Sequence, residues 1–251
     1  MEETGTLPAP DGTPLAYRRL RGTGPGVVFL GGFHSDMTGS KAEYLHGWCA
    51  ARGTPFLRMD YSGHGASGGR FVDGTIGRWA ADAEAALLAL SDGPQVLVGS
   101  SMGGWIALLL ALRHPARVRG LVGIAPAPDF TEDLMWAEFP EEVRSAILRD
   151  GAWRRPSEYG EPYPITRALI EDGRNHLLLG GRIAITAPVR ILQGDADPDV
   201  PWRHALRLAA ALDSQDVRVT LVKGGDHRLS SPRDLSLLGE TLAALLGQDA
   251  G

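Results

Sequence analysis

The 251-residue chain is 43% hydrophobic and 22% charged, with a formal net charge of −5. This length predicts one large domain, or one domain with an insertion, that can bury a substantial core without cross-links. The single cysteine, Cys49, excludes an intramolecular disulfide and a cysteine-based metal site. The acidic balance argues against a nucleic-acid-binding protein, which would usually carry a basic stripe.

Membrane and targeting signals are also missing from the sequence. The longest apolar run, Trp105 to Leu112, falls far short of the ~18–20 residues of a membrane span. The first residues, Met1 to Gly5, form neither a signal peptide nor an Arg-rich transit peptide. We therefore expect a cytoplasmic protein with no integral membrane association.

Short apolar runs rich in β-branched residues alternate with longer helical patterns along the chain. In chain order, strands are expected at Leu15–Arg19, Val27–Leu30, Phe56–Met59, Gln95–Gly99, Leu121–Ile124, Val189–Leu192 and Val217–Val222. Helices are expected at Lys41–Arg52, Arg78–Leu90, Met102–Arg113, Arg203–Leu212 and Leu235–Leu246. The middle strands are apolar almost throughout, as in a parallel sheet covered on both faces. The alternation predicts a doubly wound α/β domain.

One segment, residues 127–187, departs from this alternation because it shows no clear strand. It contains helical patterns at Glu141–Arg149 and Ile165–Asp172, together with many aromatic residues. A structureless stretch of that length is uncommon inside a compact domain. We expect a helical lid insertion at 127–187, packed over the edge of a core formed by residues 1–126 and 188–251.

The motif Gly99-Ser100-Ser101-Met102-Gly103 matches the G-x-S-x-G nucleophile elbow, a strained turn between a strand and a helix. A buried strand precedes it and a buried helix follows at once. The beginning of that helix points backbone N–H groups toward an oxyanion formed at Ser101. Ser101 is therefore the predicted nucleophile.

A second glycine-rich stretch repeats related patterns. Gly65-Ala66-Ser67-Gly68-Gly69 also reads G-x-S-x-G, and residues 63–68 read G-x-G-x-x-G. A dinucleotide site needs a helix that opens directly on the glycines, whereas Arg70–Gly77 intervenes here. We interpret this stretch as a loop and expect no cofactor.

A serine nucleophile needs a base and an orienting acid, which follow it in α/β hydrolases in the order Ser, Asp/Glu, His. His227 lies in a glycine loop directly after the last expected strand and is the predicted base. His114 suits the end of a helix, where a cation is favourable, and His176 and His204 are expected at the surface.

Three carboxylates follow the strand at Val189–Leu192. Asp197 is the predicted acid, Asp195 is the alternative, and Asp199 is expected to be a solvated turn residue or a helix cap. Their spacing also resembles the start of an EF-hand loop, but Val200 and Leu206 occupy the positions that need Gly and Glu. No metal is expected.

An oxyanion hole needs a second N–H, which the loop after the first buried strand supplies in this class of fold. The backbone N–H groups of Phe33 and Met102 are the predicted donors. His34 in the same loop is either a substrate contact or a solvated loop histidine.

Several stretches together resemble an α/β-hydrolase-domain family that contains a mitochondrial palmitoyl-protein thioesterase, also described as an acyl-glucuronide esterase. They include Phe29-Leu30-Gly31-Gly32-Phe33, Gly99-Ser100-Ser101-Met102-Gly103-Gly104-Trp105 and Asp226-His227-Arg228. The resemblance runs from about Leu15 to Leu238 and is weakest in the insertion. It implies an α/β-hydrolase fold, a triad of Ser101, Asp197 and His227, and a small-molecule or S-acylated protein as substrate.

The expected chemistry is therefore hydrolysis of a thioester or ester through an acyl-enzyme on Ser101. Apolar residues of the insertion, with Trp136 and Trp153 as the named substrate contacts, either line an acyl channel or dock the insertion onto the core. The set comprises Phe130, Met135, Trp136, Phe139, Trp153, Tyr159 and Tyr163. The alternatives are a carboxylesterase or lipase for shorter oxyesters, and a non-catalytic binding protein on the same scaffold.

Overall fold

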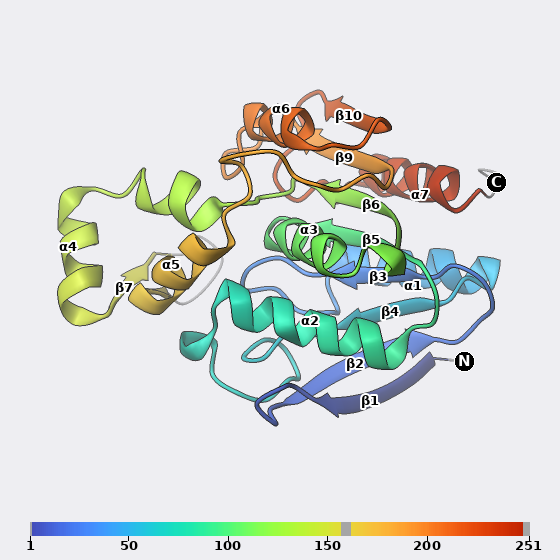
Figure 1. Ribbon diagram of the computed structural model, residues 1–251, viewed down its shortest axis with the longest axis horizontal. Helices are drawn as coiled ribbons and strands as arrows, with labels where there is room; N and C mark the ends of the chain where they lie inside the picture. The colour runs from blue at the N-terminus through green and yellow to red at the C-terminus, as the bar shows by residue number, and fades with distance from the viewer. Residues whose placement is uncertain (1, 157–161, 248–251) are drawn as a thin grey trace.

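The computed structural model describes residues 2–156 and 162–247 and contains an eight-stranded mixed sheet flanked by helices (Figure 1). The strand order is β1-β2-β4-β3-β5-β6-β9-β10, and every pair from β4 to β10 is parallel. The strands are β1 Glu2–Pro8, β2 Pro14–Leu20, β3 Val27–Leu30, β4 Phe56–Met59, β5 Gln95–Ser100, β6 Val118–Ile124, β9 Val189–Gly194 and β10 Val217–Val222. The carboxyl ends of the parallel strands lie on the left in Figure 1.

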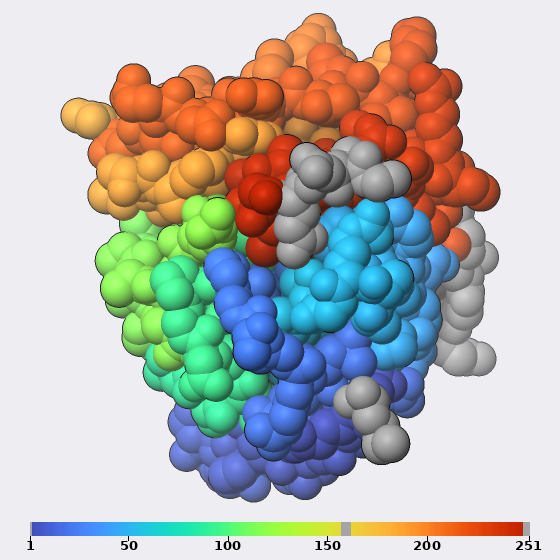
Figure 2. Space-filling model, turned by 90° about the vertical axis from the view of Figure 1, so that its right-hand side faces the viewer, coloured from blue at the N-terminus to red at the C-terminus, as the bar shows by residue number. Residues whose placement is uncertain are grey.

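Helices cover both faces of the sheet, as the alternation of strands and helices predicts. They are α1 Ser40–Arg52, α2 Ile76–Leu90, α3 Met102–Arg113, α6 Trp202–Ala211 and α7 Pro232–Leu246. Successive strand residues point to opposite faces, so Val28 and Leu30 join the core under α2, α3 and α6, whereas Val27 and Phe29 join the core under α1 and α7. Figure 2 shows α7 (red) lying beside α1 (light blue).

The edge strand β1 was not among the expected strands. Its residues are polar or small at most positions, and it lies at the sheet edge with partly exposed side chains. It pairs antiparallel with β2, where Glu3 accepts charged hydrogen bonds from Arg19 at 3.0 and 2.9 Å. Because its ordering depends on pairing and ion pairs rather than on an apolar run, hydrophobic periodicity did not reveal it.

The segment between β6 and β9 is helical only in part, so the expectation of no strand there was wrong. It contains the π-helical turn η3 Thr131–Trp136, α4 Glu141–Asp150, β7 Ala152–Arg155, β8 Tyr163–Thr166, α5 Arg167–Gly173 and the 3₁₀ turn η4 Arg174–His176. Strands β7 and β8 form a separate antiparallel pair. In Figure 1, α4, β7 and α5 extend from the carboxyl end of the sheet.

Hydrogen bonds fasten this segment to the core at several points. The indole Nε1 of Trp105 in α3 donates to the carbonyl oxygen of His176 at 3.0 Å, and the N–H of Gly77 in α2 donates to Asp172 at 2.7 Å. The buried Asp129 accepts from the N–H groups of Leu178 and Leu179 at 2.7–3.0 Å. The segment is therefore held against α2 and α3, with its β-hairpin on the side where the parallel strands end.

Candidate active site

Ser101 occupies the sharp turn between β5 and α3. Its backbone has φ +53° and ψ −118°, a strained conformation for a residue with a side chain. The turn is closed by hydrogen bonds from the Ser101 N–H to Ile124 O at 2.9 Å and from the Gly104 N–H to Ser101 O at 2.9 Å. A β-carbon at Gly99 would collide with the backbone of Gly103, and one at Gly103 would collide with the backbone of Leu30 and Gly31 at the end of β3. The two glycines of the motif are therefore required sterically, and the half-buried Ser101 side chain is left at the end of the sheet.

His227 and Asp197 reach the same point from two other loops. The Nε2 atom of His227 lies 3.1 Å from Ser101 Oγ, and its Nδ1 atom lies 2.8 Å from Asp197 Oδ2. His227 lies in the loop after β10, where the Asp226 carboxylate accepts from the Leu229 N–H at 2.9 Å. The ammonium of Lys41 in α1 donates to the carbonyl oxygen of Arg228 and fixes the same loop. The three residues expected to form a triad therefore lie in one hydrogen-bonded series.

The Asp197 side chain has an exposed fraction of 0% and its acceptor positions are filled. Oδ1 accepts from the N–H groups of Asp199 and Val200 at 2.8 and 2.9 Å, and Oδ2 accepts from Gln193 Nε2 at 3.0 Å besides His227. Burial alone would raise the pKa of this carboxyl, but the hydrogen bonds from His227, Val200 and Asp199 outweigh burial and hold the pKa below its ordinary value. Asp197 is thus an ionised, rigid acceptor.

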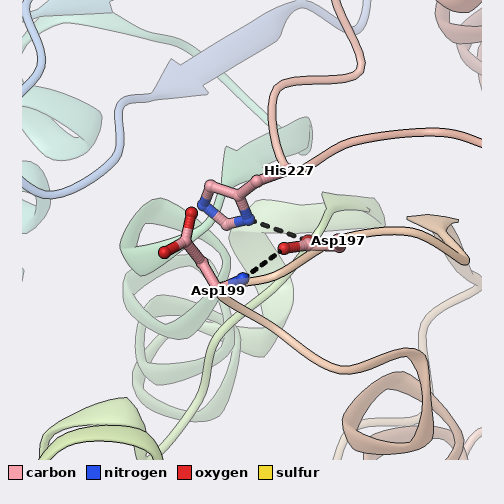
Figure 3. Close-up of side chains that lie close together, drawn as sticks. All are labelled: Asp197, Asp199 and His227. Carbon is pink, nitrogen blue, oxygen red and sulfur yellow. Dashed lines mark hydrogen bonds and ion pairs between the residues drawn. The ribbon is translucent and has the colours of Figure 1, made fainter. Parts of the chain in front are cut away.

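The other carboxylates of this loop have different surroundings. Asp195 forms an ion pair with Lys223 at 2.8 Å and accepts from the Gly224 N–H at 2.6 Å. The side chain of Asp199 is exposed and points toward His227 (Figure 3). Asp199 does not cap α6, whose N-cap residue is Pro201. Of the two candidate acids, Asp197 is therefore the one that contacts His227.

Asp197, Asp199 and His227 also form a possible metal-ligand group, with one atom of each within 4.8 Å of the others. A carboxylate offers about four lone-pair positions, and those of Asp197 already accept four hydrogen bonds. A cation at Asp197 would have to displace His227 or a backbone N–H. The donor set therefore fits a hydrogen-bonded acid and base better than a metal centre.

The loop expected to supply an oxyanion donor passes directly beside Ser101. A β-carbon built on Gly32 would lie 3.4 Å from Ser101 Cβ. Met102 is the first residue of α3, so its N–H has no partner within the helix. The Phe33 N–H likewise donates to no acceptor among residues 2–156 and 162–247. In the described part of the chain neither N–H has an acceptor, and their role as oxyanion donors stays a prediction.

His34 and the two tryptophans expected to contact substrate lie in different places. The His34 ring stacks on Tyr163 of β8, with centroids 5.3 Å apart, beside the Phe33 ring. Trp136 carries the Arg174 guanidinium over its ring at 5.0 Å, and Trp153 packs edge-on against Phe139 at 5.5 Å. These ring contacts lie within the segment between β6 and β9, and both tryptophans are partly buried against the hydrophobic core under α2, α3 and α6. Tyr159 lies outside the described residues.

The burial of two histidines was not expected from the sequence. His204, expected at the surface, is 7% exposed, and its Nε2 atom lies 2.7 Å from the carbonyl oxygen of Pro128. His64 is 4% exposed, and its Nε2 accepts from the His34 N–H at 3.3 Å. Both make long-range contacts that no local pattern encodes. The glycine stretch around His64 is a loop, as expected, because α2 begins only at Ile76.

Known proteins resemble this chain over most of its length. Residues 25–158 match the family described as serine aminopeptidase, S33. The chain is 39% identical over 242 residues to rat palmitoyl-protein thioesterase ABHD10, mitochondrial, covering 96% of this chain and 81% of that protein. A pimeloyl-[acyl-carrier protein] methyl ester esterase of Chromobacterium violaceum is 40% identical over 145 residues, or 55% of this chain and 52% of that protein.

Solved structures extend the similarity over nearly the whole chain. A putative hydrolase from Agrobacterium vitis S4 superposes with a TM-score of 0.94 and 44% identity, covering 98% of this chain and 99% of that one. The α/β hydrolase domain-containing protein 10 from mouse gives 0.90 and 38% identity, with 98% of each chain covered. The chain therefore belongs to the α/β-hydrolase family, and the expected fold is confirmed. Its thioesterase and esterase relatives identify it as an ester-hydrolysing enzyme.

In the described part of the chain, no helix has the length and apolar character needed to cross a membrane. The mammalian relatives are named as mitochondrial proteins. The cytoplasmic location expected from the sequence stays a prediction, which cell fractionation tests.

Proposed function

We propose that the chain is a serine hydrolase that cleaves acyl thioesters or esters through an acyl-enzyme on Ser101. The observation that carries this proposal is the hydrogen-bonded series from Ser101 through His227 to Asp197, at 3.1 and 2.8 Å. The chain separates these residues by 126 and 30 positions, so their meeting is a property of the fold rather than of one local motif. Serine, base and orienting acid in this order are the arrangement required for nucleophilic acyl transfer.

In the first half-reaction, Ser101 Oγ attacks the acyl carbonyl carbon while His227 Nε2 takes the hydroxyl proton. Asp197 accepts a hydrogen bond from Nδ1–H, which keeps the imidazole in the required tautomer and stabilises the imidazolium. The carbonyl oxygen becomes an oxyanion that the Phe33 and Met102 N–H groups stabilise, at about 3 kcal/mol per donor. The C–S or C–O bond then breaks, and the leaving group takes the proton from Nε2.

In the second half-reaction, a water molecule replaces the leaving group. His227 Nε2 removes a proton from that water as it attacks the acyl-serine carbonyl. The second tetrahedral intermediate collapses to a free carboxylic acid, and the proton returns to Ser101 Oγ. The cycle consumes one water and no redox equivalent, and His227 carries out each proton transfer.

We further propose that the preferred substrates are S-acylated proteins or related long-chain thioesters. The 39–40% identity to thioesterases over most of the chain supports this choice. Residues 127–187 would act as the lid and acyl pocket, because Tyr163 of β8 packs against Phe33, with ring centroids 5.7 Å apart, beside the proposed oxyanion hole. The shorter match to a methyl ester esterase makes hydrolysis of shorter oxyesters the second candidate.

Labelling with a fluorophosphonate probe tests the nucleophile. We expect stoichiometric labelling of the native chain and none of the Ser101→Ala variant. Ser100→Ala is the matched control, because it changes the adjacent hydroxyl in the same turn and should leave labelling intact. Labelling that persists in Ser101→Ala would exclude Ser101 as the nucleophile.

A matched panel of thioesters and oxyesters tests the substrate class. Acetyl, octanoyl and palmitoyl groups would each be presented on the same thiol and on the corresponding alcohol. We expect kcat/KM to rise with chain length on the thiol series. A preference for short oxyesters would favour the carboxylesterase alternative instead.

A further inference from the structure

The side chain of Asp199 stands at the edge of the proposed catalytic site without a role in the mechanism. Its backbone N–H donates to Asp197 Oδ1 at 2.8 Å, which fixes the position of the residue. Its carboxylate is exposed and comes within 4.8 Å of a ring nitrogen of His227. Figure 3 shows that carboxylate beside the His227 ring, on the side away from Asp197. Asp199 therefore places a second negative charge next to the proposed base, and this one is in contact with solvent.

The other acidic residue of the same loop is neutralised, whereas Asp199 is not. Asp195 forms an ion pair with Lys223 at 2.8 Å. Within the described ranges, the Asp199 carboxylate forms no ion pair and accepts no hydrogen bond from a side chain. Its charge is thus available to a bound molecule.

The charge of the Asp199 carboxylate also acts on Tyr163 of β8, which lies beside the proposed site. Burial raises the pKa of the Tyr163 hydroxyl, Arg155 of β7 lowers it, and Asp199 raises it further. Both charges therefore act at Tyr163, whose ring packs against Phe33 and His34 of the loop beside Ser101. Asp199 provides the negative charge from the β9–α6 loop, and Arg155 provides a positive charge from the hairpin.

In the proposed mechanism, the leaving group must lie next to His227 Nε2, because that atom returns its proton. We propose that Asp199 is a specificity-determining residue that favours leaving groups with neutral or cationic neighbouring groups and disfavours anionic ones. This inference rests on the proposed function and deepens it. The substrate class it selects is an acylated cysteine flanked by Lys or Arg, rather than an acyl-glucuronide, whose leaving group carries a carboxylate.

The test compares two S-octanoyl peptides that differ only in charge, one with lysines flanking the acylated cysteine and one with glutamates. We expect the wild-type chain to favour the lysine peptide in kcat/KM. Asp199→Asn should reduce that preference by roughly three- to tenfold, the range for one unit charge about 5 Å away in a partly solvated site. Asn keeps the backbone N–H to Asp197 and nearly the same shape, so the substitution removes mainly the charge.

Asp195→Asn is the matched control, since it removes the same charge from the same loop at a position paired with Lys223. It should leave the preference unchanged. High salt should reduce the wild-type preference, because an exposed charge is screened. An unchanged preference in Asp199→Asn would overturn the inference, and so would an equal fall for both peptides, which would mean that Asp199 only positions the triad.

Fluorophosphonate labelling separates these outcomes from failure of the proposed function. If wild-type Ser101 is not labelled, the proposed function fails. If Ser101 is labelled and the chain hydrolyses both peptides equally at low salt, only the inference about Asp199 fails. If Ser101 is labelled but neither peptide is hydrolysed, the proposed thioester substrates fail together with the inference.

Discussion

The buried His64 predicts a loss of stability in mild acid. The side chain is 4% exposed and packs edge-on against Tyr61, Phe71 and Trp79. Its Nε2 accepts from the His34 N–H, so the ring is neutral, with Nδ1–H directed at the carbonyl oxygen of Ser62, 3.3 Å away. Burial lowers the pKa of His64 from 6.5 to about 4, with a smaller contribution to the lowering from His34.

The sign and size of the effect follow from proton linkage. Between the two pKa values the unfolded chain binds a proton at His64 and the folded chain does not, so stability rises with pH across this window. On acidification, stability is therefore lost from about pH 6.5 down to about pH 4. The pKa difference of about 2.5, at 1.36 kcal/mol for each pKa unit, corresponds to about 3 kcal/mol. That is a large part of the 5–15 kcal/mol typical of a folded domain.

This contribution can be measured by urea unfolding. The wild-type chain and a His64→Gln variant are compared from neutral pH to pH 4. Gln is less stable at neutral pH, because it fills the aromatic cage poorly, but it does not titrate. The free-energy gap between the two proteins should therefore shrink by about 3 kcal/mol on acidification. Carboxyl groups titrate equally in the two proteins, so their contributions to the free-energy gap cancel. A gap that stays constant across the window would refute the assignment of a neutral, buried His64.

Three further substitutions or reagents test individual features. Asp197→Asn should lower kcat by about 10⁴-fold, because it favours the wrong histidine tautomer. Asp195→Asn should keep a kcat near that of the wild type in steady-state assays. The reverse ranking would make Asp195 the acid. Gly103→Ala should destabilise the fold by roughly 1–3 kcal/mol or more, because its β-carbon would collide with the carbonyl oxygen of Leu30, and an unchanged melting temperature would contradict that contact. Burial raises the pKa of Cys49 to about 12, so iodoacetamide should alkylate it only after unfolding, as read by mass spectrometry; rapid alkylation of the native chain would show that the thiol is accessible.

The parts of the fold that were predictable are those with strong local patterns. The helix Met102–Arg113 and the strands Val27–Leu30 and Phe56–Met59 have the predicted bounds, since each is mostly apolar and is delimited by glycine, proline, polar or charged residues. Strands β7 and β8 escaped prediction because each has only four residues, with consecutive arginines in one and a proline in the other. These two strands are stabilised by pairing with each other, and hydrophobic periodicity does not indicate such pairing.

The same distinction applies to the site. Ser101, Asp197 and His227 follow β5, β9 and β10, and parallel strands bring such loops to one edge of a sheet. Sequence order was therefore enough to predict that they meet. Trp136 and Trp153 lie in the segment between β6 and β9, whose packing depends on distant contacts such as that between Trp105 and His176. Aromatic composition could not reveal which side those rings face.

Asp197 and Asp199 show why catalytic residues and specificity residues differ in predictability. Two positions apart, one carboxylate is inaccessible with four hydrogen bonds, and the other is exposed beside His227. The first is fixed by strand β9 and its loop, so any substrate meets the same acid. The second forms no ion pair within the described ranges, so its charge remains available to the leaving group. Asp197→Asn should slow the hydrolysis of every substrate, whereas Asp199→Asn should change only the preference between differently charged substrates. With both results, one loop would hold the residue for the reaction chemistry and the residue for substrate choice two positions apart.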